Sequence, residues 1–317
     1  MGEYHILVLR QKIHGMDATS YADVLRERLP ECSVTLATTP EEEQQALETA
    51  DIATGFELSE YDLERAENLT LFACVYAGTS HLDIDVFEKH DVAVTSASGV
   101  HGPNMSEYVI GAMISHAKGF PRARTQQGRR EWRSYQTREL HGSTVTVVGL
   151  GAIGDAVVDR LEGFGTKTVG VRYTPEKGGP TDELYGFDEI HEAVADAEYV
   201  VLACPLTDTT EGLVDADVFR TMRGDAILVN VARGPVVDTD ALVSALRWNR
   251  IGGATLDVTD PEPLPEDHPL WSMDNVTITP RNSGYTPVYF ERCGDILTRN
   301  VERLRAGEVD ELVNRVV

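Results

Sequence analysis

The sequence predicts an α/β protein made of two domains, each a doubly wound parallel sheet. Its 317 residues fit about two domains of roughly 100–200 residues each. Two separate series of short apolar segments alternate with amphipathic ones, which is typical of parallel sheets covered by helices. A hydrophobic content of 42% against 25% charged residues is that of a globular chain.

The first series of segments occupies the first hundred residues. Its expected strands and amphipathic segments are His5–Leu9, Tyr21–Leu29, Ser33–Ala37, Glu41–Glu48, Ile52–Thr54, Leu71–Val75 and Val92–Thr95. A long helical pattern from Ser106 to about Gly128 follows, and we expect it to link the two domains. The tail from Val288 to Arg305 is again helical in pattern and is expected to return to the first domain.

A second series starts at Thr144. Its six expected strands, the number that a doubly wound dinucleotide domain requires, are Val145–Val148, Thr168–Val171, Tyr199–Ala203, Ala226–Val231, Gly253–Val258 and Val276–Thr279. We therefore expect one domain from 1–100 with 285–317 and a second domain from 101–284.

The formal charge is −24 with a pI near 4.7, and lysine occurs only at Lys12, Lys89, Lys118, Lys167 and Lys177. Such a charge repels nucleic acids and anionic membranes, so we expect neither as a partner. Dispersed carboxylates with few lysines are our basis for proposing a halophilic cytoplasm, where salt screens self-repulsion over about 3 Å at 1 M. An ordinary acidic mesophilic protein is the alternative.

No apolar run reaches the roughly 20 residues needed to cross a bilayer, and the acidic start of the chain is unlike a signal peptide. Cys32, Cys74, Cys204 and Cys293 lack metal-binding spacing, so free thiols in a reducing cytoplasm are expected. His81 and His268 are expected to cap turns or pack locally, and no histidine belongs to a metal-binding pattern. We predict no metal.

The strand Val145–Val148 runs into Gly149-Leu150-Gly151-Ala152-Ile153-Gly154 and then a helical pattern. Gly149 permits a tight turn, Gly151 lets the backbone approach a pyrophosphate, and Gly154 allows the helix to pack closely on the strand. The helix N-terminus, with Ala152 and Ile153, favours the negative charge. Strand, motif and helix together predict a Rossmann domain that binds a nicotinamide dinucleotide.

About 20 residues later, no carboxylate stands where an acid would bind the ribose 2′-hydroxyl of NAD. The second strand ends instead in Arg172-Tyr173-Thr174, whose guanidinium could bind a 2′-phosphate with help from the two hydroxyls. NADP(H) is therefore the preferred cofactor, with NAD(H) possible as well. A solvent-facing arginine at a strand end is the alternative for Arg172.

Four further motifs lie before or after the glycine turn: Tyr76-Ala77-Gly78-Thr79-Ser80-His81-Leu82-Asp83, Cys204-Pro205-Leu206-Thr207 with Thr210, Asn230-Val231-Ala232-Arg233-Gly234, and Leu256-Asp257-Val258 followed by Pro261-Glu262-Pro263-Leu264-Pro265. In these motifs, and over nearly its whole length, the chain resembles the D-isomer-specific 2-hydroxyacid dehydrogenase family. The resemblance implies hydride transfer between a nicotinamide and a small 2-oxo acid or D-2-hydroxy acid. It also implies a flavodoxin-like substrate domain beside the Rossmann domain.

The family's site residues carry over by position. Arg233 would bind the substrate carboxylate and carbonyl oxygen, as suits a guanidinium fork, or form an interdomain ion pair. Asp257 would hold the nicotinamide carboxamide, or cap a strand end. The remaining implied contacts are Tyr76, Ala77, Gly78 and His101 for the substrate, and Cys204, Pro205, Thr210, Val231, Ala232, Ser283 and Gly284 for the cofactor.

The chain departs from the family at Thr279-Pro280-Arg281-Asn282-Ser283-Gly284, where Arg281 stands in place of the catalytic histidine that Glu262 would orient. An arginine cannot exchange a proton near neutrality. Arg281 could stabilise a developing alkoxide, contact the carboxylate, or lock Glu262 in a salt bridge. The chain would then be a slow enzyme, a natural variant with another donor such as His101 or Tyr285, or an engineered inactive form.

Two other functions compete with the reductase: a nicotinamide-binding sensor or partner-binding module without efficient catalysis, and a phosphite- or formate-type dehydrogenase. The resemblance also implies a homodimer formed through an arm from Arg122 to Arg138, which contains Trp132. An arginine-rich, solvated helix end is the alternative for that arm.

Overall fold

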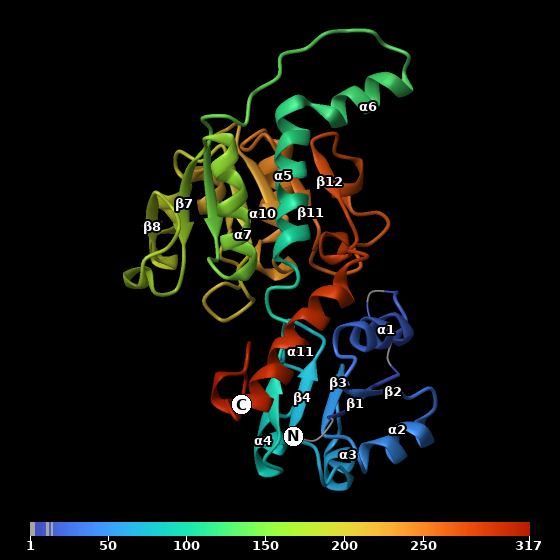
Figure 1. Cartoon of the computed structure of the whole chain (residues 1–317). Helices are drawn as coiled ribbons and strands as arrows, with labels where there is room; N and C mark the ends of the chain where they lie inside the picture. The colour runs from blue at the N-terminus through green and yellow to red at the C-terminus, as the bar shows by residue number, and fades with distance from the viewer. Residues whose placement is uncertain (1–3, 11–12, 14) are drawn as a thin grey trace. The chain divides into compact units, whose positions relative to one another are not determined.

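The computed structural model describes residues 4–10, 13 and 15–317, and the chain divides into two units. Unit 1 comprises residues 1–101 and 286–317, and unit 2 comprises 102–285. Both are α/β units with a parallel sheet, which confirms the predicted fold class (Figure 1).

Unit 1 contains a parallel five-stranded sheet with the order β2-β1-β3-β4-β5, the flavodoxin-like order. Its strands are β1 His5–Val8, β2 Ser33–Leu36, β3 Ile52–Gly55, β4 Leu71–Cys74 and β5 Ala93–Thr95. Its helices are α1 Ala18–Arg28, α2 Pro40–Leu47, α3 Glu60–Arg65, α4 Ile84–Lys89 and α11 Tyr289–Ala306. The short helices α3 and α4 were not predicted, because six residues give too little helical periodicity.

Alternation along β1 places successive side chains on opposite faces of this sheet. Ile6 and Val8 belong to the buried cluster that also contains residues of α1 and α11, while Leu7 and Leu9 belong to the cluster beneath α2 and α4. Helix α11 is further tied to α1 by ion pairs between Arg28 and the side chains of Glu291 and Asp295. The helix predicted in the tail therefore forms part of unit 1.

Unit 2 contains a parallel seven-stranded sheet with the order β12-β11-β10-β9-β6-β7-β8. Its strands are β6 Thr144–Val148, β7 Lys167–Val171, β8 Glu183–Tyr185, β9 Tyr199–Leu202, β10 Ile227–Asn230, β11 Gly253–Leu256 and β12 Val276–Ile278. Its helices are α5 Gly102–Lys118, α6 Phe120–Gly128, α7 Ala152–Leu161, α8 Ile190–Val194, α9 Ala216–Thr221 and α10 Thr239–Arg247. The strand order reverses between β6 and β9, and a ligand crevice is expected at such a point.

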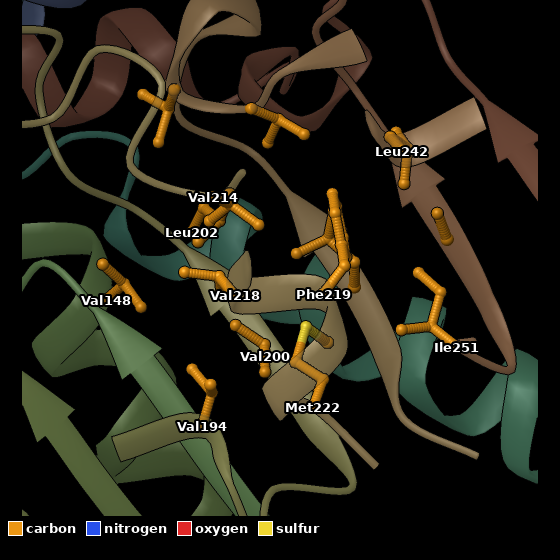
Figure 2. Packing of buried hydrophobic residues seen from close by; sticks show 14 of the residues in the cluster. Val148, Val194, Val200, Leu202, Val214, Val218, Phe219, Met222, Leu242 and Ile251 are labelled. Atoms are coloured by element: carbon orange, nitrogen blue, oxygen red, sulfur yellow. The ribbon is translucent and has the colours of Figure 1, made fainter. Parts of the chain in front are cut away.

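Both faces of this sheet are buried. Val145 and Val147 of β6 belong to the cluster with residues of α5 and α7, whereas Val148 belongs to the cluster on the opposite face. Figure 2 shows that second cluster, in which Val200 and Phe219 lie among other buried aliphatic side chains. Packing on both faces explains why β9 is a continuous apolar run and why β6 is buried over four of its five residues.

Two predictions for unit 2 need correction. The single helix expected over 106–128 is two helices, because Gly119 adopts a left-handed conformation (φ 65°) between α5 and α6 and Pro121 lies in the first turn of α6. The six predicted strands are all present, but β8 adds a seventh. It was missed because its three residues are at most partly buried and carry no apolar alternation.

His116 of α5 gives a prediction for stability. Its imidazole lies close to the hydroxyl of Thr255 in β11 (Nε2–Oγ1 3.0 Å), and burial lowers the pKa of His116 to about 4. In the unfolded state His116 has a pKa near 6.5, so between pH 6.5 and 4 it binds a proton there but not in the native state. The contribution of His116 to the free energy of unfolding is therefore complete above about pH 6.5 and is lost as the pH falls towards 4. Between pH 7.5 and 5 the loss is about 2 kcal/mol.

Thermal unfolding at pH 7.5 and pH 5 checks this expectation against His116→Gln, which has no titrating group at this position. The variant should lose less stability than the parent over that interval. An equal loss in both proteins would show that other groups govern the acid sensitivity.

Candidate functional site

The turn after β6 requires glycine at two positions. Gly149 has φ 100°, and a Cβ there would lie 2.5 Å from the backbone nitrogen of Cys204. A Cβ on Gly154 would lie 2.0 Å from the carbonyl oxygen of Gly149. By contrast, a Cβ on Gly151, at the N-terminus of α7, would meet nothing within 4 Å. Strand and helix therefore pack through two glycines, while the third leaves open space in front of the helix N-terminus.

A cavity of about 310 Å³ opens beside this turn, where β6, β7 and β9 end. Its lining brings together many of the residues predicted to contact the cofactor and adds others; the full set is Gly149, Leu150, Gly151, Arg172, Tyr173, Thr174, Phe187, Ala203, Pro205, Thr207 and Thr210. Phe187 was missed by sequence reasoning, because it follows the short strand β8 that the pattern did not reveal.

Arg172 supplies the cation of this cavity. Its backbone N–H donates to Tyr185 of β8, and its guanidinium donates to the carbonyl of Gly178 (Nη1–O 2.6 Å). The neighbouring Tyr173 is 78% exposed. The loop after β7 thus fixes a positive charge at the cavity with no carboxylate at the strand end.

The loop after β9 forms the other wall of the cavity and is stiffened by Thr210. The buried Thr210 hydroxyl donates to the carbonyl of Pro205 (2.6 Å) and accepts from the backbone N–H of Thr207 (2.8 Å). Burial raises the pKa of the Cys204 thiol to about 11, so this cysteine stays a neutral thiol near pH 7.

Beyond β10, Asn230 shapes the segment that carries Arg233. The buried Asn230 side chain accepts from the N–H of Ala232 (3.0 Å) and donates to the carbonyl of Arg233 (3.2 Å). Val231 and Ala232 are buried, whereas the Arg233 side chain is exposed. The Arg233 guanidinium is therefore presented at the carboxyl end of the sheet.

Arg281 and Glu262 form a bidentate ion pair, with Nε–Oε1 and Nη2–Oε2 distances of 2.5 Å. The hydrogen bond that Arg281 donates to Glu262 raises the pKa of Arg281 above its ordinary value. The backbone of Arg281 is left-handed (φ 57°), a conformation that costs about 1–3 kcal/mol outside glycine and persists only when the surroundings impose it. Of the three contacts considered for Arg281 from the sequence, the structure shows the salt bridge to Glu262.

Asp257 lies next to this pair and is 3% exposed. Its carboxylate accepts hydrogen bonds from the hydroxyls of Thr279 (2.6 Å) and Ser283 (2.5 Å) and from the backbone N–H groups of Asn282 (2.8 Å) and Ser283 (3.1 Å). Ser283 is buried, and Gly284 follows it in the same turn. The two strand ends after β11 and β12 are thus joined through one carboxylate.

The residues expected to contact the substrate from unit 1 lie in two places. Tyr76, just after β4, packs edge-on against Phe56 (centroids 4.9 Å apart), and Ala77 and Gly78 follow it. His101, at the end of unit 1, lies near the ring of Tyr289 (centroids 5.3 Å apart). Tyr76 and His101 therefore come from different segments of this unit.

His81 and His268, which were predicted to cap turns or pack locally, both do this in the structure. His81 stacks on Phe56 with centroids 4.2 Å apart, and its Nε2 lies 2.9 Å from the Phe56 carbonyl. His268 accepts from the N–H of Leu270 at the start of a 3₁₀ turn. Tyr285, the second candidate donor, is 53% exposed at the end of unit 2.

Within the described ranges, no group of three or more His, Cys, Asp or Glu side chains could hold a metal ion. All four cysteines are buried, and none of them takes part in a disulfide. Of the helices in residues 4–10, 13 and 15–317, none is long and apolar enough to span a membrane.

Comparison with known proteins places these features in a family context. The model of the D-isomer specific 2-hydroxyacid dehydrogenase NAD-binding domain matches residues 110–283. The chain is 35% identical to the glyoxylate reductase of Thermofilum pendens over 266 residues, covering 80% of this chain and 78% of that protein. It is 34% identical to the glyoxylate reductase/hydroxypyruvate reductase of Homo sapiens over 221 residues, covering 67% of each.

Among solved structures, it resembles a D-isomer specific 2-hydroxyacid dehydrogenase from Xanthobacter autotrophicus Py2 in complex with NADPH and MES. That structure is 29% identical, with a TM-score of 0.80 and 98% coverage of both chains.

Proposed function

Since the chain belongs to the D-isomer-specific 2-hydroxyacid dehydrogenase family, an oxidoreductase family, we propose that it transfers a hydride between NADP(H) and a small 2-oxo acid or D-2-hydroxy acid. The observation that carries this proposal is the cavity of about 310 Å³ at the glycine turn, with Arg172 in its lining. The relatives named above as glyoxylate and hydroxypyruvate reductases support the substrate class.

The residues of the cavity fit a dinucleotide. Open space at Gly151 lets a pyrophosphate reach the N-terminus of α7, and Arg172 offers a cation for a 2′-phosphate. The nicotinamide would supply or accept the hydride when bound. The solved relative with NADPH bound agrees with this cofactor preference.

For the substrate we propose the roles that the family implies. Arg233 is exposed at the end of β10 and suits a carboxylate, which needs a fixed cation in so acidic a protein. Backbone N–H groups at Ala77 and Gly78 would add donors, and Tyr76 would shape the pocket for the substrate side chain. Because Arg281 stays protonated, the proton would come from His101 or from Tyr285, more slowly than from a histidine at position 281.

The alternative function is a catalytically impaired NAD(P)-binding homologue that acts as a sensor. The bidentate Arg281–Glu262 pair favours it, because Glu262 is engaged with a group that cannot release a proton. We also propose a homodimer in a cytoplasm of high ionic strength. The fully exposed Trp132 on the segment that loops out after α6 supports an assembly surface (Figure 1), and the net charge of −24 supports the salt.

NADPH and NADH oxidation with glyoxylate and hydroxypyruvate in high salt tests the proposed function. The parent should use NADPH with the lower KM, and Arg172→Ala should raise the KM for NADPH by about 10-fold or more, since a charge-assisted contact contributes about 1.5–3 kcal/mol. The KM for NADH should change little.

Arg160→Ala, on α7 outside the cavity lining, is the matched control and should change neither KM. Equal effects of Arg172→Ala on both cofactors would contradict recognition of the 2′-phosphate. Binding of NADPH without oxidation by any 2-oxo acid would favour the sensor.

A further inference from the structure

Donors of the segment 279–283 form hydrogen bonds to both oxygens of the Asp257 carboxylate. A carboxylate offers about four lone-pair positions, and four donors approach this one. Thr279 Oγ1 and the N–H of Asn282 bind Oδ1 at 2.6 and 2.8 Å, and Ser283 Oγ binds Oδ2 at 2.5 Å. The N–H of Ser283 lies 3.1 Å from both oxygens. A carboxylate so occupied holds the segment in one arrangement.

The chain of hydrogen bonds continues to helix α5. The Thr279 hydroxyl donates its one hydrogen to Asp257. The Tyr108 hydroxyl must therefore be the donor in its 2.5 Å contact with Thr279 Oγ1. Burial, and then the nearby Asp257 charge, raise the pKa of Tyr108 to about 12, which keeps its proton in place. One turn earlier on the same helix face, Asn104 Nδ2 donates to the carbonyl of Ser283 (2.7 Å).

The residue held between these contacts is Arg281. Its N–H donates to the carbonyl of Asp257 (2.9 Å), its backbone is left-handed, and its guanidinium meets Glu262. The charged groups that act on it are Glu262 and Asp257. Thr279 and Ser283, two residues away on either side, are both fixed to Asp257.

We propose that Tyr108 and Thr279 are positioning residues of the candidate active site, which act through Asp257 to hold position 281 against Glu262. The site's use in 2-oxo acid reduction rests on the proposed function, but the placement of position 281 does not. Tyr108 lies 171 residues from Thr279 in the sequence. The family motifs found in the sequence do not include Tyr108.

The placement of position 281 beside Glu262 can be measured without cofactor or turnover, in the variant Arg281→His. The new histidine is titrated by NMR and is identified as the imidazole signal that the parent lacks. Glu262 should raise the pKa of that histidine above its ordinary value of about 6.5. Adding Tyr108→Phe, or Thr279→Val, should return this pKa towards about 6.5 by half a unit or more. Thr279→Ser retains the hydroxyl and should leave the pKa raised.

Tyr135→Phe is the matched control, because it too removes a tyrosine hydroxyl that donates a hydrogen bond, in this case to the carbonyl of Gly119 (2.9 Å), away from the site. It should leave the titration unchanged. An ordinary pKa in Arg281→His alone would overturn the proposal, and so would a raised pKa that survives both Tyr108→Phe and Thr279→Val. Should Tyr108→Phe fail to fold, the Val and Ser pair at Thr279 decides alone. Absence of reductase activity would contradict the proposed function and leave this readout intact.

Discussion

Arg281→His is expected to raise kcat/KM for 2-oxo acid reduction by about 10²–10⁴-fold, the range that general acid catalysis supplies. In the parent, the guanidinium keeps its proton from pH 6 to 9 and donates two hydrogen bonds to Glu262. A histidine beside Glu262 would instead carry an exchangeable proton close to neutrality. The gain should therefore come mainly in kcat.

The pH profile separates this explanation from a binding effect. The activity of Arg281→His in the reductive direction should fall as the pH rises through the pKa of the new imidazole, because the acid form is the donor. The parent lacks this imidazole and should show no limb at that pKa. Steady-state rates of NADPH oxidation between pH 6 and 9 provide the comparison.

Arg281→Gln is the control for simple release of Glu262, because it removes the ion pair without adding a proton donor. It should show no comparable gain. Equal, high activity of the parent and Arg281→His would mean that His101 or Tyr285 already donates the proton. If all three proteins bind NADPH and none turns over, the impaired homologue becomes the better description.

What the sequence could predict depends on how local the determining interactions are. The glycine turn was predictable because strand, motif and helix lie within about 17 consecutive residues, 145–161. The hydrogen bonds that link Tyr108, Thr279 and Asp257 were not predictable, because Tyr108 and Thr279 are brought together only by the packing of α5 beside the sheet of unit 2.

The same reasoning applies to the departures from the expected elements. Strand β8 has three residues, and its position depends on pairing with β7. The break at Gly119 follows from a left-handed backbone at one residue, which an apolar pattern running through it conceals. For Arg281, the sequence offered three roles for one side chain, and only the position of Glu262 in space selects the ion pair.

Gly151→Ala is expected to abolish most cofactor affinity while leaving the fold unchanged. The backbone at Gly151 is extended (φ −135°), and a Cβ there meets nothing within 4 Å, so stability should stay within about 0.5 kcal/mol of the parent. The added methyl group would occupy the space through which a pyrophosphate approaches the N-terminus of α7. The Kd for NADPH, measured by its fluorescence, should rise by about 10-fold or more, a change of at least about 1.4 kcal/mol.

Gly154→Ala should have the opposite pattern, because its Cβ would lie 2.0 Å from the Gly149 carbonyl oxygen, a backbone atom that cannot turn away. A core clash of this kind is expected to destabilise by about 3 kcal/mol or more, seen as a lower melting temperature without cofactor. Gly163→Ala, also in open space but outside the cavity lining, should change neither property. Normal NADPH affinity in Gly151→Ala would mean that the dinucleotide does not pass over this turn, and the cavity would lose its assigned ligand.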